Sequence, residues 1–437
     1  MTALTITGAR LLDPASGTDE IGGIMVVDGQ ISKVGPDVTA GSAMGGPVID
    51  AKGLCLSPGL VDLRVKTGEP GEEHRETLAT ASAAAAAGGA TTLVLMPDTR
   101  PVIGDAALVT HLRAPVPLHG SPTVRLEVAG ALTVDLAGKA MAEMGLMAEA
   151  GAVFFSNGDE PVTDPVVLKR AMAYGASQGV LIASRPDTPA LRGNGVMNSG
   201  GFAARLGLSG IPKEAEWIGA ARDILLAEVT GCRLLLDQVS TPRTLDLVAD
   251  AKARGVNVYA SVAAHHLFFN EMDVGDYLTY CKVNPPFRSE ADRLALVEGV
   301  KAGVIDAVVS AHDPQPPETK RLPISEASFG AAGLETTLSA MMSLVEAGHL
   351  SLLEALKPLT VTPADLIGRQ QGRLAVGAPA DLILFDPFAP WKCKREHLRS
   401  RSTNSPFDGR LLQGQVMRTI LAGVTVFDRA AERAAAD

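Results

Sequence analysis

The sequence has little of what marks secreted, membrane-spanning or nucleic-acid-binding proteins. Cysteine is scarce and forms no Cys-X-X-Cys pair, which predicts reduced thiols in a cytosolic protein; the four are Cys55, Cys232, Cys281 and Cys393. The N-terminus has no basic region followed by an apolar core, and the apolar run Ala81–Ala90 is too short to cross a bilayer. The formal net charge of -10 and the lack of any Lys or Arg run argue against nucleic acid as a partner. We therefore expect a soluble, cytoplasmic protein.

What the sequence does have is length and regular alternation. Its 437 residues are 46% hydrophobic and 20% charged, which suits a globular protein with a large core. Apolar runs alternate with helical patterns, which predicts βαβ units and a parallel sheet; the runs are Thr91–Met96, Ala152–Phe155, Val180–Ala183, Arg233–Leu236, Val256–Ala260 and Ala307–Val309. Repeats of this kind over about 300 residues suit a (β/α)8 TIM-type barrel, although periodicity alone leaves a doubly wound sheet open.

Both ends of the chain differ from this middle part. Residues 1–55 alternate in strand fashion with tight Gly and Asp-Gly turns, and residues 366–437 return to that style. The two segments are predicted to pair into one small, discontinuous β-sandwich domain beside a barrel over residues 56–365. The C-terminal segment also carries a basic loop, with Lys392, Lys394, Arg395, His397, Arg399, Arg401 and Arg410. This basic loop is either simply solvated or a docking or anion-binding surface.

The stretch Pro58–Gly71 predicts where the chemistry would lie. It is an apolar strand that runs into a Gly-Glu-Pro-Gly turn, and α/β barrels carry functional residues at the carboxyl ends of their strands. The stretch resembles the first barrel strand of the dihydroorotases, which are cyclic amidohydrolases. That family has an Asp-X-His-X-His-Leu-Arg-Glu-Pro-Gly run there and holds zinc with the two histidines. Asp62 and the Glu-Pro-Gly frame are kept, whereas Arg64 and Lys66 replace the histidines.

Further blocks extend the resemblance to class I dihydroorotases over nearly the whole chain. They include Gly88–Pro97, Leu206–Pro212, Lys282–Arg288 and Phe329–Thr336. The resemblance implies a (β/α)8 barrel and a reaction, the reversible opening and closure of a cyclic amide. That reaction needs a metal-activated hydroxide as nucleophile and a carboxylate to shuttle the proton. Whether this chain performs it depends on its own site residues.

The positions that match the family's metal set hold residues that cannot take its place. Instead of the histidine pair, the bridging carboxylate, two later histidines and the proton-shuttling aspartate, the sequence has Arg64, Lys66, Asn157, Ser184, Gln238 and Ala311. Zinc needs three or more imidazoles, thiolates or carboxylates, so we predict neither a metal nor catalytic residues. Two cations would also repel a divalent ion, by roughly 4 kcal/mol per unit-charge pair at 4 Å and an effective dielectric constant of 20. We expect them to fill the vacated cavity and to pair with Asp62, Asp98 or Asp313.

The residues that would contact substrate are also altered. The resemblance places Gly68 where the family has the arginine that clamps the substrate carboxylate, and Asp98 where it has an asparagine. Asp98 puts a negative charge near the place of an anionic substrate, which is unfavourable. Asn284 is retained as a remnant of the substrate site.

Three functions remain open after this comparison. The favoured one is a non-catalytic dihydroorotase-like protein of de novo pyrimidine biosynthesis, which by resemblance would be a structural partner of aspartate carbamoyltransferase in a mixed oligomer. The second is an active dihydroorotase with zinc displaced to His312 and Asp313, while the neighbouring His265 and His266 are expected to be structural. The third is a binding protein whose barrel mouth captures an anion.

Overall fold

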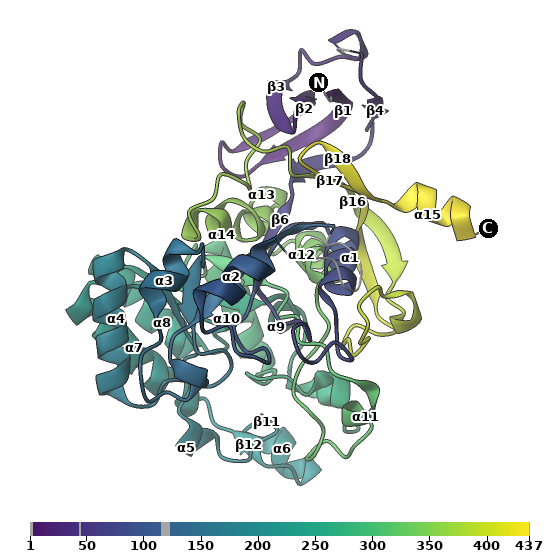
Figure 1. The fold of residues 1–437 in the computed structure, drawn as a ribbon. Helices are drawn as coiled ribbons and strands as arrows, with labels where there is room; N and C mark the ends of the chain where they lie inside the picture. The colour runs from purple at the N-terminus through teal and green to yellow at the C-terminus, as the bar shows by residue number, and fades with distance from the viewer. Residues whose placement is uncertain (1–2, 43–44, 115–122, 437) are drawn as a thin grey trace.

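The chain folds into an α/β barrel with a separate β-sheet domain (Figure 1). The structure is a computed structural model that describes residues 3–42, 45–114 and 123–436. The barrel has eight parallel strands: β6 (Leu60–Val65), β7 (Ala90–Leu95), β8 (Arg125–Ala131), β9 (Phe154–Ser156), β10 (Leu181–Ser184), β13 (Arg233–Leu236), β14 (Val258–Ala263) and β15 (Ala307–Val309). Just beyond the ends of β6 and β15 the Lys66 amide donates to the carbonyl of His312 at 2.9 Å, which nearly closes the barrel. The barrel prediction is therefore confirmed and the doubly wound sheet is excluded.

Helices follow the strands; the longer ones cover the outside of the barrel, and several short ones lie at its ends. The helices are α1 (Leu78–Gly88), α2 (Ala106–Arg113), α3 (Met144–Glu149), α4 (Pro165–Gln178), α5 (Pro189–Arg192), α6 (Gly201–Leu206), α7 (Glu214–Thr230), α8 (Pro242–Ala253), α9 (Ala264–Phe268), α10 (Glu290–Lys301), α11 (Pro317–Lys320), α12 (Thr337–Glu346), α13 (Leu352–Leu356) and α14 (Val361–Leu366). The last residue of α1 packs closely against the chain: a Cβ atom on Gly88 would lie 2.1 Å from the carbonyl oxygen of Leu334. No helix in the described ranges is long and apolar enough to cross a membrane.

Strand β8 is a barrel strand that the apolar runs did not predict. Its sequence contains Arg125 and Glu127, which break the apolar pattern expected of a strand in a parallel sheet. Glu127 is nevertheless buried, because Arg369 donates to it at 2.6 Å and Arg113 lies 3.4 Å away. The carboxylate of Glu127 is paired with residues from elements distant in the sequence. A local sequence pattern therefore cannot predict that it is buried.

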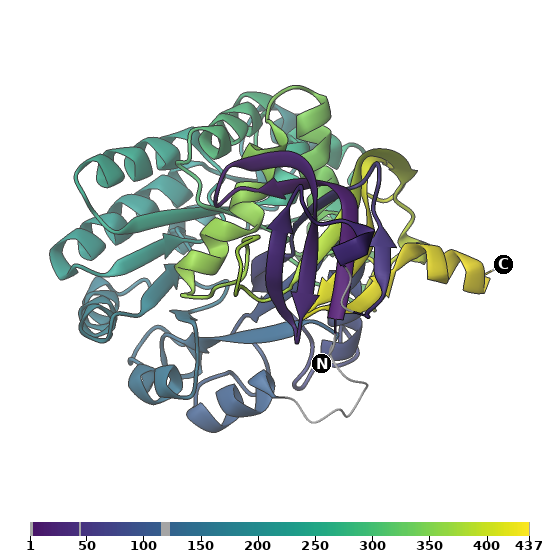
Figure 2. The same cartoon turned by 90° about the horizontal axis from the view of Figure 1, so that it is seen from above.

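The separate domain combines strands from both ends of the chain, as predicted. Figure 2 shows the N-terminal strands beside the C-terminal ones. They are β1 (Ala3–Asp13), β2 (Thr18–Val27), β3 (Gln30–Gly35), β4 (Val48–Asp50), β5 (Cys55–Pro58), β16 (Leu382–Lys392), β17 (Leu411–Leu421) and β18 (Val424–Asp428). All eight belong to one hydrogen-bonded sheet, β18-β17-β16-β5-β1-β2-β3, with β4 paired to β1. Ile31 of β3 and Leu384 of β16 share one apolar core, so the sheet folds around its own side chains.

The barrel core has an inner and an outer part. Alternate residues of each strand point either into the barrel or toward the helices. In β6, Val61 and Leu63 belong to the inner cluster, whereas Leu60 and Val65 belong to the outer one. The pairing of β6 with β7 shifts register between Asp62 and Val65. This irregularity changes the direction in which the side chains at the mouth of the barrel point.

Two phenylalanines on β16 test how much of the stability comes from packing. Phe385 is fully buried and Phe388 is 64% exposed. Phe385→Ala is expected to lower the free energy of unfolding by about 3–5 kcal/mol, because it leaves a cavity. Phe388→Ala, the matched control, should change it by less than about 0.5 kcal/mol. Chemical denaturation measures both, and equal effects would contradict the assignment of Phe385 to the core.

Candidate functional site

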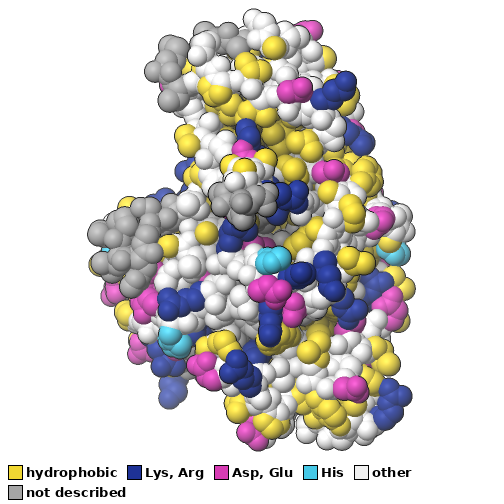
Figure 3. Space-filling model, turned by 90° about the vertical axis from the view of Figure 1, so that its right-hand side faces the viewer, with side chains coloured by type: hydrophobic (Ala, Val, Ile, Leu, Met, Phe, Trp, Pro, Cys, Tyr) yellow, Lys and Arg dark blue, Asp and Glu magenta, His cyan; other side chains and the backbone are white. Residues whose placement is uncertain are grey.

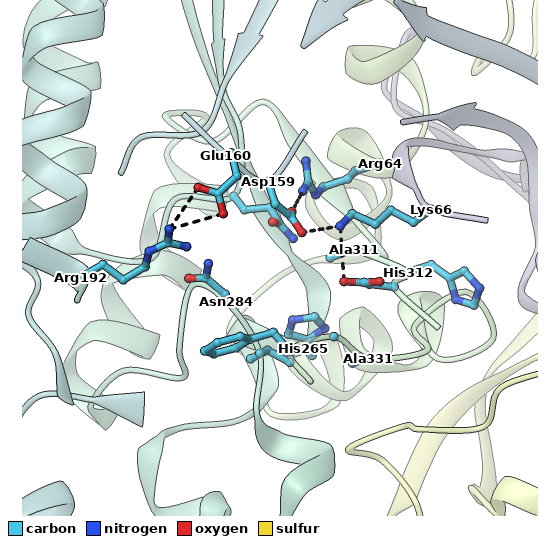
Figure 4. Close-up of a pocket in the computed structure, with 15 residues that line it drawn as sticks. Arg64, Lys66, Asp159, Glu160, Arg192, His265, Asn284, Ala311, His312 and Ala331 are labelled. Carbon is cyan, nitrogen blue, oxygen red and sulfur yellow. Dashed lines mark hydrogen bonds and ion pairs between the residues drawn. The ribbon is translucent and has the colours of Figure 1, made fainter. Parts of the chain in front are cut away.

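The carboxyl end of β6 brings two cations to the mouth of the barrel. Since Val61 and Leu63 point inward, strict alternation would turn Arg64 outward, toward the helices. The register shift at this point re-aims the chain, as irregular strand ends beside functional sites often do. Arg64 is only 3% exposed, and it lies with Lys66 along one wall of the cavity at the barrel mouth (Figure 4).

Arg64 is held by two carboxylates. Its Nη1 atom donates to Asp237, which follows β13, and its Nη2 atom donates to Asp159 Oδ1 at 2.5 Å. Ser261 of β14 also donates to Asp237, at 2.9 Å, and fixes that carboxylate. Burial on its own lowers the pKa of Arg64, but the charges of Asp237 and Asp159 outweigh burial and raise it. The guanidinium is therefore a permanently charged bridge between two loops.

Lys66 is surrounded by three carboxylates. Its ammonium bonds Asp159, lies 2.8 Å from Asp98 Oδ2 and 3.5 Å from Asp313 Oδ2. Arg75 in turn contacts Asp313 at 3.0 Å. Burial favours the neutral form of Asp159, but Lys66 and the neighbouring arginines outweigh burial and hold the pKa of this carboxyl well below its usual range. An ammonium thus occupies the centre of an oxygen-rich cage.

The expected pairing of these cations is confirmed for two carboxylates and wrong for a third. Asp98 and Asp313 contact Lys66 as predicted. Asp62 does not: it accepts backbone N–H groups, from Arg64 at 3.1 Å and from Ser310 at 3.2 Å. Because Asp62 is buried without a cation, its pKa rises to about 6.

Asp159 is the site residue that sequence reasoning missed. It contacts both Arg64 and Lys66, and Arg185 lies 3.5 Å from it. It stands two places after Asn157, in the turn that follows β9. Two features of the sequence together could have identified it. One is the extra carboxylate in a turn at the end of a strand, and the other is the pair of uncompensated cations on another strand.

The other substituted positions are engaged in ordinary hydrogen bonds. Asn157 donates to the carbonyls of Leu136 and Glu160 at 2.9 and 3.0 Å. Ser184 donates to Asp223 at 2.7 Å. The last two positions, Gln238 and Ala311, line the cavity, and Gln238 accepts from Arg185 at 2.6 Å.

Gly68 and Asp98, the two altered substrate positions, have surroundings that differ from those of Asn284. A Cβ atom on Gly68 would lie 1.8 Å from the backbone oxygen of Glu72, so the local fold leaves no room for any side chain there. Asp98 points its charge at Lys66, as described above. Asn284 lines the cavity, and its side-chain amide has no hydrogen-bond partner among the described residues.

His312 and Asp313, the candidates for a displaced metal, do not converge. The His312 ring contacts Glu76 at 3.3 Å and accepts from the Gly333 amide at 3.3 Å. Figure 4 shows this ring turned away from the ion pairs of Lys66. Asp313 faces Lys66 and Arg75 instead.

The residues present do not fit zinc. Within residues 3–42, 45–114 and 123–436, no group of three or more His, Cys, Asp or Glu side chains is arranged to hold a metal ion. The carboxylates that do converge surround the ammonium of Lys66, and a cation as strongly held as this one blocks the place of a metal.

His265 and His266 are buried, as expected of structural residues. Burial lowers the pKa of His265 to about 3, and it lowers the pKa of His266 as well, so both rings are neutral at pH 7. His266 bonds the carbonyl of Pro285 at 2.9 Å. His265 packs edge-on against Phe287 and lines the cavity.

The basic loop lies against the barrel mouth and is partly neutralised. Asn404 accepts from the Gln315 amide at 3.0 Å, which ties the loop to the segment after β15. Arg399 pairs with Glu335 and Arg410 with Asp273. Four further cations of the loop are exposed and form no ion pair among the described residues: Lys392, Lys394, Arg395 and Arg401. Arg395 donates to the hydroxyl of Tyr280 at 3.0 Å instead. The same face of the molecule mixes charges of both signs (Figure 3).

Removing the ammonium of Lys66 should expose the cage around it. Lys66→Met leaves three carboxylates facing one another, which is expected to cost about 3 kcal/mol of stability. Calcium ions prefer carboxylate oxygens and should restore part of the loss. Thermal unfolding with calcium or with chelator measures this, and Lys52→Met at an exposed site is the control. A calcium effect of equal size on the parent protein would contradict the cage.

Acid is expected to weaken the same cluster. The folded-state pKa of Asp159 is lowered, so its ion pairs contribute fully above the unfolded-state value of about 3.9 and are lost as the pH falls below it. Denaturant unfolding at pH 7 and at pH 3.5 measures the decline. Asp159→Asn should flatten it, whereas Asp250→Asn, at an exposed helix position, should not. An unchanged slope in Asp159→Asn would contradict the prediction.

The chain is similar in sequence to known protein families and to individual proteins. Residues 53–243 match the Dihydro-orotase-like family and residues 329–427 match the Amidohydrolase family. A protein of Citrifermentans bemidjiense named dihydroorotase is 37% identical over 424 residues, which are 97% of this chain and 99% of that protein. Another dihydroorotase, from Pelotomaculum thermopropionicum, is 40% identical over 97% of this chain and 98% of its own.

Solved structures support the same assignment. The L-hydantoinase (dihydropyrimidinase) from Arthrobacter aurescens superposes with a TM-score of 0.88 at 27% identity, over 98% of this chain and 97% of its own. The dihydropyrimidinase from Brevibacillus agri, at 20% identity, has a TM-score of 0.82 over 98% of this chain and 95% of its own, and it shows the fold alone. With relatives of this identity along nearly its full length, the chain belongs to the dihydroorotase family of the amidohydrolases.

Proposed function

We propose that this chain is a dihydroorotase-family protein that does not catalyse ring opening and that serves as a structural partner in pyrimidine biosynthesis. The observation that carries the proposal is the cage around Lys66. By resemblance Arg64 and Lys66 take the sequence positions of the family's metal-binding histidines, and both are paired with carboxylates, sharing Asp159. Without a metal-bound hydroxide, the reaction lacks its nucleophile.

The side chains inside the site form specific hydrogen bonds, although they differ from the family's metal-binding residues. Residues that lost a metal-binding side chain have acquired specific hydrogen bonds, such as those of Asn157 and Ser184. Breaking a buried ion pair typically costs about 3–5 kcal/mol, so the cluster holds the strand ends of the barrel together once it has formed. A barrel maintained in this way suits a structural role.

Aspartate carbamoyltransferase is the proposed partner by resemblance to the non-catalytic members of the family. On this chain, the exposed cations Lys392, Lys394 and Arg401 are charged groups available to a partner with an acidic surface. A hetero-oligomer would also use the packed barrel as a scaffold, and a cytoplasmic location follows from that partnership.

The second candidate is an active dihydroorotase. The observation that favours it is the name of the relatives, which are 37–40% identical over nearly the full chain. A metal would then have to displace Lys66 from Asp98, Asp159 and Asp313. The third reading, an anion-binding barrel, is less favoured because carboxylates neutralise Arg64 and Lys66.

One preparation tests these proposals together. The chain is expressed with zinc supplied and with the aspartate carbamoyltransferase of the same organism, and then purified. We expect no stoichiometric zinc, no interconversion of carbamoyl aspartate and dihydroorotate, and co-purification of the transcarbamoylase with a change in its activity. Bound zinc with turnover would overturn the non-catalytic proposal, and failure of the two proteins to associate would overturn the partnership.

A further inference from the structure

The end of strand β16 has an exposed apolar side. Exposed residues alternate there with more buried ones, so Phe388, Pro390 and Lys392 point to the same side of the sheet. Leu411 of β17 pairs with Lys392 across the two strands and shares that side, where it is 75% exposed. Leu412, which points the other way, is buried. Phe388, Pro390, Lys392 and Leu411 thus form one exposed surface, which we call the β16 face.

Positive charge is concentrated beside the β16 face. Residues 392–410 contain six of the chain's 39 Lys and Arg residues but only two of its 49 Asp and Glu residues. Lys394 and Arg395 directly follow the face, and neither forms an ion pair within the described part of the chain. Figure 3 looks onto the side of the molecule where β16 and β17 lie, and it shows Lys and Arg side chains next to apolar ones. In a chain with a net charge of -10, this local excess of cations favours an acidic partner.

The basic loop is already fixed in place by the chain itself. The Cys393 amide donates to the carbonyl of Arg410 at 2.9 Å, and the Gly409 amide donates to the carbonyl of Cys393 at 2.8 Å. The pairing of β16 with β17 therefore continues into the loop. Farther along the loop, the Arg401 amide donates to Glu76 at 3.0 Å. A surface that is ordered before binding loses little conformational entropy when a partner docks, which strengthens the complex.

A folded protein fits this surface better than a membrane or a nucleic acid. Segments that lie in a membrane interface are typically amphipathic helices, whereas this surface is the end of a β-hairpin. Glu396 and Asp408 are both exposed in the loop and would repel lipid headgroups or phosphates of negative charge. Protein interfaces combine apolar anchors with a charged rim, and here Phe388 and Leu411 lie beside the cations.

We propose that the β16 face, together with Lys394 and Arg395, docks the acidic surface of a partner protein, with Phe388 and Leu411 as apolar anchors. The inference rests on the proposed function, since the partner used to test it is the aspartate carbamoyltransferase of that proposal. It goes beyond that function because it assigns the contact to one side of the β domain, away from the barrel mouth, and requires apolar anchors as well as charge.

Charge reversal tests the electrostatic part of the proposal. Lys392→Glu combined with Lys394→Glu should weaken binding of the transcarbamoylase at least about tenfold and make the affinity less sensitive to salt. Lys169→Glu combined with Arg170→Glu changes the charge equally at exposed positions of α4 and should bind as the parent does. Calorimetric titration of the purified, full-length proteins at low and high ionic strength measures both effects. Equal affinities of the parent and the Lys392/Lys394 variant would overturn the proposal.

Truncation of the apolar side chains tests the anchors. Phe388→Ala and Leu411→Ala should each weaken binding of the transcarbamoylase about tenfold or more, as loss of an interface anchor does. Leu225→Ala, at an exposed position of α7, is the matched control and should bind as the parent does. All three side chains are exposed, so thermal unfolding should be unchanged in each variant. If both anchor variants bind as the parent does, the assigned surface is wrong.

The same titrations separate this inference from the proposed function. If the parent binds the transcarbamoylase and every surface variant binds equally well, only the docking surface is overturned. If the parent does not bind the transcarbamoylase at all, the partnership is overturned and the docking surface with it. Association of the parent with phosphatidylserine vesicles but not with the transcarbamoylase would identify a membrane-binding surface and would overturn the protein partner.

Discussion

The neutralisation of Arg64 and Lys66 by four aspartates is the interaction on which the barrel mouth depends. Each aspartate comes from a different strand end, so the cluster joins loops after β7, β9, β13 and β15 to β6. A buried cation without a counter-charge would cost several kcal/mol, and the loop after β9 is the most constrained because its Asp159 pairs with both cations. The arrangement cross-links the strand ends at the mouth through side-chain charges.

The rest of the fold does not depend on this charge cluster. The apolar layers of the barrel and the sheet made from both chain ends are those of the amidohydrolases, and structures of that family superpose on them. A barrel of this kind is stabilised by its core, while function resides in the loops at one end. The 40% identity with a relative named dihydroorotase therefore reflects the shared fold and does not by itself fix the residues at the mouth.

The paired charges give the mouth of the barrel a character of its own. The cavity is lined by both cations and carboxylates, and Arg64, Lys66 and Arg192 each pair with a carboxylate there. The cavity is therefore polar without carrying a strong charge of one sign.

The sequence predicted the barrel and the β domain built from both ends, and by resemblance it predicted that the family's metal-binding residues are replaced. These predictions rest on the spacing of apolar residues and on short sequence motifs. Both are formed by residues that lie close together in the chain. Only the tertiary structure decided which carboxylates besides Asp98 and Asp313 meet the cations. Asp159 and Asp237 lie 95 and 173 positions from Arg64, and the paired charges that bury Glu127 in β8 are similarly remote. It also decided that His312 turns to Glu76 and that a register shift aims Arg64 at the cavity. Such contacts depend on how strand ends converge in space, and no local pattern encodes that convergence.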